Sequence, residues 1–160
     1  MTTAVAKKIG SKNGVICIAL GIATAQMIMF FFIVNWNQDF WGSFFWFTKI
    51  NYGLNLIVGI LLMLLSGYFY GQMAGVAILI KNFDAIWTGL LTGLAVLFTT
   101  AFLCGFTGYF QEGLQNNVDD PFFDYVLKPF YWISFFGLVP ALVVGAWFGL
   151  RIKSHKKEII

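Results

Sequence analysis

Apolar residues run through this chain in four long, almost uninterrupted stretches that are separated by short polar segments. The stretches cover about residues 15–34, 52–80, 85–110 and 130–150. A helix needs about 20 apolar residues to cross a hydrocarbon layer of roughly 30 Å, and each stretch reaches that length. Continuous runs disfavour a β-barrel, whose strands alternate over segments of about ten residues. The pattern predicts an all-α integral membrane protein, built as a four-transmembrane-helix bundle.

The composition supports this fold class and narrows the range of partners. Of the 160 residues, 59% are hydrophobic and 17 are glycine, which brings their share to about 70%, against roughly 45–50% in soluble domains. Charged residues make up 11% of the chain, where about 25% is usual. We therefore expect membrane lipid around the protein. Nucleic acid is not expected as a partner, because its binding needs a basic face.

Basic residues gather on one side of the predicted membrane. Lys49 and Lys128 fall on the other side. By the positive-inside rule, this asymmetry places both termini in the cytoplasm, in a plasma or inner membrane. We expect residues 1–14 to form a cytoplasmic N-terminal tail and residues 151–160 a basic cytoplasmic C-terminal tail. The eight basic residues on the cytoplasmic side are Lys7, Lys8, Lys12, Lys81, Arg151, Lys153, Lys156 and Lys157.

Small residues recur at intervals of four in the predicted helices. Small side chains at this spacing form a shallow groove in which two helix backbones approach closely. Two interpretations stay open. The grooves pack the four helices within the chain, or at least one groove is spare and binds a second copy or another membrane protein. The first stretch holds a weaker pair, Ala19 and Ala23, and the predicted helix-packing residues are Gly67, Gly71, Gly75, Gly89, Gly93, Gly137, Ala141, Gly145 and Gly149.

Polar side chains within the apolar stretches are few, and three of them are candidates for binding a neutral solute: Gln26, Asn55 and Gln72. Such groups more often join helices to one another by hydrogen bonds. Gln72 lies between Gly71 and Gly75. The helix predicted for the long second stretch would break most easily here, because two glycines and a polar amide occur together. A broken helix there would indicate a solute path, because irregular backbone inside a membrane must face protein or water. The alternative, which we prefer, is that Gln72 already lies near the cytoplasmic interface.

The two loops on the outer side carry further signals. A short helix at the membrane interface is predicted by the helical spacing of Phe40, Trp41, Phe44, Phe45 and Thr48. The alternative for this aromatic loop is a lid over a binding site. The second loop predicts a short helix over residues 122–126, because an aspartate followed by proline marks a helix start.

Asp119, Asp120 and Asp124 form an acidic cluster in this second loop. It is a further candidate for a metal site, or for a lipid-modifying enzyme that uses Mg²⁺ with a diphosphate. Such an enzyme also needs basic partners for phosphate, and only Lys128 is near. We expect helix capping by these aspartates, no catalytic residues and no cofactor.

Taken together, these patterns lead to one main hypothesis on function. We expect a non-catalytic multi-pass membrane protein that acts by helix–helix assembly, as a homo-oligomer or as an accessory subunit of a larger membrane complex. The small-residue rows and the apparent lack of a catalytic set motivate it. The alternative is an oligomeric channel or facilitator for a small neutral solute.

Overall fold

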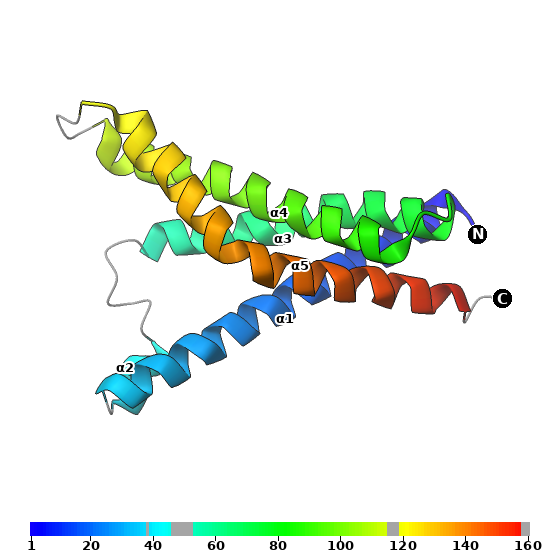
Figure 1. Ribbon diagram of the computed structural model, residues 1–160, viewed down its shortest axis with the longest axis horizontal. Helices are drawn as coiled ribbons and strands as arrows, with labels where there is room; N and C mark the ends of the chain where they lie inside the picture. Colours follow the sequence, from blue (N-terminus) through cyan, green and yellow to red (C-terminus); the bar gives the residue numbers. More distant parts are fainter. Residues whose placement is uncertain (38, 46–52, 115–118, 158–160) are drawn as a thin grey trace.

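The computed structural model describes residues 1–37, 39–45, 53–114 and 119–157, and in this part of the chain all regular structure is helical (Figure 1). Two of the segments, η2 and η3, have the wider π-helical hydrogen-bonding pattern. The elements are α1 (Thr3–Asn37), α2 (Phe40–Phe44), α3 (Gly53–Leu79), α4 (Ala85–Gly108), η2 (Tyr109–Gly113), η3 (Phe123–Leu127) and α5 (Lys128–Lys157).

Four of the described helical stretches are long and apolar enough to cross a membrane, which confirms the all-helical prediction with four such helices. The shortest, Gly53–Leu79, has 27 residues. At a rise of 1.5 Å per residue it is about 40 Å long, more than the roughly 30 Å of a hydrocarbon layer. Both chain ends lie at the same end of the bundle, which we call the termini end (Figure 1). The opposite end, which holds α2, η2 and η3, is called the loop end.

The two predicted tails are helical in the structure. Helix α1 begins at Thr3 instead of near residue 15, and α5 continues to Lys157 instead of ending near residue 150. Burial explains both extensions, because Ala6 and Ile152 have no exposed surface. Burying such side chains against a neighbouring helix stabilises turns that would fray in an isolated tail. The polar residues in these segments concealed the extensions in the sequence pattern.

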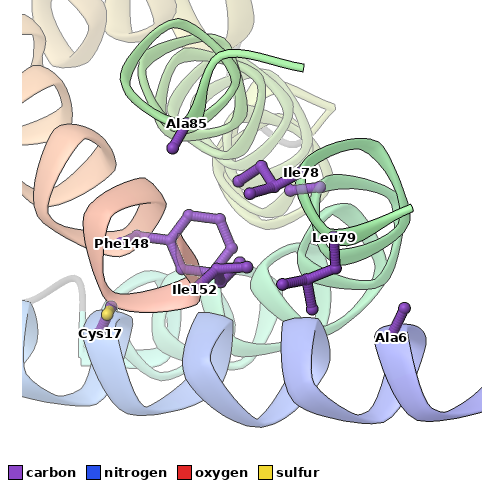
Figure 2. Packing of buried hydrophobic residues seen from close by; sticks show 8 residues of the cluster. Ala6, Cys17, Ile78, Leu79, Ala85, Phe148 and Ile152 are labelled. Atoms are coloured by element: carbon purple, nitrogen blue, oxygen red, sulfur yellow. The ribbon is translucent and has the colours of Figure 1, made fainter. Parts of the chain in front are cut away.

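The largest cluster of buried apolar side chains lies at the termini end (Figure 2). Phe148 and Ile152 of α5 fill the space between α1 on one side and the ends of α3 and α4 on the other. The cluster therefore ties the last turns of α5 to the first turns of α1. Its members are Ala6, Cys17, Ala74, Ile78, Leu79, Ala85, Phe148 and Ile152.

A tight turn joins α3 to α4 at the same end. Asn82 has a φ of 57°, a left-handed conformation that asparagine tolerates better than most residues. Asp84 then caps α4, since its carboxylate accepts a hydrogen bond from the backbone N–H of Trp87 at 2.9 Å. This cap satisfies one of the amides that the first turn of a helix leaves without an intrahelical partner.

At the loop end, one predicted short helix forms as a separate element, apart from Thr48, which lies outside the described residues; the segment predicted as a second short helix is the start of a longer one. Helix α2 covers Phe40–Phe44, and Asp39 caps it. In this longer helix, the segment Phe123–Leu127 is π-helical and continues directly into α5. Helix α5 also contains Pro140, which lacks a backbone N–H, and the helix bends along its middle part (Figure 1).

Candidate functional site: the small-residue helix interfaces

The closest approach between α1 and α3 occurs where glycines of both helices meet. A Cβ atom added to Gly71 would lie 2.7 Å from the carbonyl oxygen of Gly10, and one added to Gly75 would lie 2.9 Å from the Cα of Gly10. Gly14 lies in the same way against the backbone of Gly67. The two backbones are therefore in van der Waals contact, and this contact leaves no room for a side chain.

Helices α4 and α5 approach one another in the same manner. A Cβ atom on Gly145 would lie 2.6 Å from the carbonyl oxygen of Gly89, and one on Gly93 would lie 3.2 Å from the Cα of Gly145. Gly149 lies against the carbonyl oxygen of Ala85. The structure thus contains two glycine-lined crossings, α1 with α3 and α4 with α5, both between helices of one chain.

Each predicted helix-packing residue can now be placed. Gly67, Gly71 and Gly75 face α1, and Gly89 and Gly93 face α5. Gly137 lies against the side chain of Leu97 in α4, and the remaining three residues also face α4: Ala141, Gly145 and Gly149. The rows therefore meet in pairs inside the chain. Three partners of the α3 row lie in the segment that the sequence pattern assigned to a tail: Ala6, Gly10 and Gly14. Their spacing of four was the signal that would have identified them.

One small-residue row is left without such a partner. Ala19 and Ala23 are exposed on α1, and Ala25 beside them is exposed as well. Gly21 is half-buried, and a Cβ atom there would make only an ordinary contact of 3.7 Å with Val144 of α5. The two alanines lie on a side of α1 that the described helices leave uncovered, and α1 also diverges from α3, α4 and α5 as it runs towards the loop end (Figure 1).

The three candidate solute-binding residues do not come together. Gln26 Nε2 donates a hydrogen bond to the carbonyl oxygen of Phe44 at 2.8 Å, which attaches α2 to α1. Asn55 and Gln72 lie on the same helix, 17 positions and so about 25 Å apart. Helix α3 is continuous through Gly71 and Gly75, so the backbone break that would indicate a solute path is absent from this helix.

Asn55 nevertheless has an unusual environment. Its backbone carbonyl accepts a hydrogen bond from the Cys104 thiol at 3.2 Å. Its side-chain Oδ1 is buried and has no hydrogen-bond partner among the described residues. Farther along α3, the hydroxyl oxygens of Tyr70 and Thr99 lie 2.9 Å apart, and this contact joins α3 to α4. The sequence pattern did not identify Tyr70 as a residue that bonds two helices, because it is one of many aromatic residues in the apolar stretches.

Two carboxylates of the acidic cluster interact with the protein itself, one as a helix cap and one in an ion pair, and not around a common metal position. The carboxylate of Asp120 accepts a hydrogen bond from the backbone N–H of Phe123 at 3.0 Å, as a helix cap does. Asp124 Oδ1 lies 3.8 Å from Lys128 Nζ, in an exposed pair one helical turn apart. Over the described residues, no three His, Cys, Asp or Glu side chains gather in a way that would hold a metal ion.

Comparisons with known proteins found no relative whose function could suggest a role for this chain. No protein family, no curated protein and no solved structure matches this chain. Its function is therefore argued from the surfaces described above.

Proposed function

We propose that this protein is a non-catalytic integral membrane protein that acts by assembly, as a homo-oligomer or as an accessory subunit of a larger membrane complex. The observation that carries the proposal is the exposed small-residue row on α1, Ala19 and Ala23. The other rows are covered by neighbouring helices of the same chain. This row is left over after the chain has packed, and it has the spacing that lets a second helix approach closely.

The divergence of α1 supports the same proposal. Towards the loop end, this helix runs away from α3, α4 and α5 (Figure 1), and there Phe30 contacts Phe40 and Phe44 of α2. Beside Ala19 and Ala23 on the helix surface, the side chains of Leu20 and Met27 are about half exposed. A helix of a partner would bury this face and bring its own backbone against Ala19 and Ala23.

Charge placement supports an orientation with the termini end in the cytoplasm. Eight of the ten basic residues belong to this end, and the positive-inside rule relates such an excess to the cytoplasmic side. A plasma or inner membrane has this polarity. The exposed helix α2, with Phe40 and Trp41 on its surface, would then lie at the outer interface, where aromatic rings are favoured.

The proposal is tested with the double variant Ala19→Leu/Ala23→Leu in the full chain. We expect the wild-type protein, released from its source membrane in mild detergent, to have the mass of a complex by native mass spectrometry. The double variant is expected to lose the partner, because two leucines fill the groove. Leu91→Phe is the control, since it adds volume to a side chain that is 65% exposed on α4, a helix that is not packed against α1.

Two results would contradict the proposal. One is a wild-type protein that has the mass of a single chain under conditions in which other complexes of the same membrane stay intact. The other is a complex whose mass the double variant leaves unchanged.

A further inference from the structure

A groove of about 520 Å³ lies at the termini end, on the face of α1 beside α3. Five of its lining residues come from α1 and recur at the spacing of one helix face. Tyr68 of α3 forms the opposite wall. The residues from α1 are Lys8, Ser11, Lys12, Val15 and Ile16.

The wall of this groove is almost wholly apolar, because Lys8 and Lys12 line it with their carbon stems, and their uncompensated charge lies at its edge. Lys8 and Lys12 are exposed and lie one helical turn apart, so both ammonium groups reach the same region. Neither lysine forms an ion pair with a described residue. The Ser11 hydroxyl donates to the carbonyl oxygen of Lys8 at 3.2 Å and so does not neutralise the charge. Helix α1 contains no acidic residue.

The rest of the groove is apolar and follows the direction in which α1 enters the predicted membrane. Lys12 is the last charged residue before Asp39, and Val15 and Ile16 come directly after it on the same face. Ile16 lies eight residues, or about 12 Å, beyond Lys8 along the helix axis. The groove is therefore apolar along its length and has two cationic groups at its edge, a distance from Ile16 similar to that between a phospholipid headgroup and the upper part of its acyl chains.

We propose that this groove binds one anionic phospholipid, with its phosphate between Lys8 and Lys12 and an acyl chain along Val15, Ile16 and Tyr68. Two unpaired lysines select negative charge, and the apolar wall selects a ligand that carries a hydrocarbon chain. A soluble phosphate would use only the lysines. The cytoplasmic leaflet is rich in anionic lipids, so the proposed orientation supplies this ligand in high local concentration.

The test measures lipid binding to the full chain and does not depend on assembly. The protein is freed of lipid in mild detergent and titrated with phosphatidylglycerol or phosphatidylcholine of the same acyl chains. Native mass spectrometry then gives the dissociation constant of the first bound lipid. Each lysine near an anionic surface strengthens binding about fivefold, so we expect phosphatidylglycerol to bind about thirtyfold more tightly than phosphatidylcholine.

Variants separate this groove from the general positive charge of the termini end. Lys8→Gln/Lys12→Gln is expected to remove the preference for phosphatidylglycerol. The control Lys81→Gln/Lys153→Gln removes the same charge from two other exposed residues at this end and is expected to keep the preference. Ile16→Ser is expected to weaken the binding of both lipids, because the acyl chain of either lipid would lie along the apolar wall that this variant alters.

Three results would overturn the proposal. The first is equal binding of the two lipids by the wild-type chain. The second is an equal loss of preference in the control, which would assign the effect to the surface charge as a whole. The third is displacement of phosphatidylglycerol by an equal concentration of glycerol phosphate, which would show a site for a soluble anion. A failure of the assembly proposal would leave these lipid measurements unchanged.

Discussion

Gly71 lies against the backbone of α1 in the α1–α3 crossing, and Gly71→Ala is a small change that tests this contact. The new Cβ atom would lie 2.7 Å from the carbonyl oxygen of Gly10 and 3.3 Å from the Cα of Ser11, both backbone atoms. An ordinary contact at this position begins near 3.4 Å. Since no side chain can rotate away, α1 must move by about 0.7 Å, which weakens the close packing around the crossing.

The expected loss of stability follows from two opposing effects. Forcing a methyl group into a close-packed interface costs about 1–3 kcal/mol. Alanine is favoured over glycine inside a helix by up to about 1 kcal/mol, which offsets part of that cost. We expect a net loss of about 1–2 kcal/mol in the free energy of unfolding. For a chain of this size, the loss corresponds to a fall in Tm of roughly 2–8 °C.

Thermal unfolding in lipid–detergent bicelles, followed by circular dichroism, measures this effect. Gly21→Ala is the matched control on α1, because a Cβ atom there makes an ordinary contact of 3.7 Å with Val144. The control is expected to keep the wild-type Tm or to exceed it. A Tm for Gly71→Ala equal to that of Gly21→Ala would refute the reasoning, since it would show that the two backbones are not in contact at this crossing.

Two further predictions concern polar groups. Tyr70→Phe removes the 2.9 Å contact with Thr99, and a double-mutant cycle with Thr99→Val is expected to give a coupling of about 0.6 kcal/mol between α3 and α4; a coupling of zero would count against this bond. Asp84→Ala removes the cap of α4 and is expected to lower the unfolding free energy by about 1 kcal/mol, whereas Asp84→Asn keeps a capping oxygen. Equal Tm values for the two Asp84 variants would contradict the capping role.

Much of the architecture could be predicted because a membrane-spanning helix has a local signature. The number of long apolar helices, the cap at Asp120 and the short helix at Phe40 all follow from runs or spacings of a few residues. The ends of the long helices could not be predicted in the same way. At both termini, helical turns with polar residues are stabilised by contacts from distant parts of the chain, as the burial of Ile152 shows.

The helix-packing residues show the same difference between what local spacing predicts and what depends on the fold. The spacing of four made Gly71 and Gly145 visible as packing residues, since the groove that such residues form is a property of one helix. Spacing does not say which helix lies in that groove. Gly10 illustrates this, because its packing role depends on α3, more than 50 residues away in the chain.

Residue order alone therefore established an all-helical chain with four long apolar helices, an excess of positive charge at one end and several rows of small residues. The tertiary structure decided which of these rows are covered. It paired the row of α3 with Gly10 and Gly14, paired α4 with α5, and left Ala19 and Ala23 exposed. The physical reason is that each row offers close backbone contact to any suitable helix. The fold places α1 against α3 and α4 against α5, so these rows cover one another, whereas no described helix covers the side of α1 that carries Ala19 and Ala23.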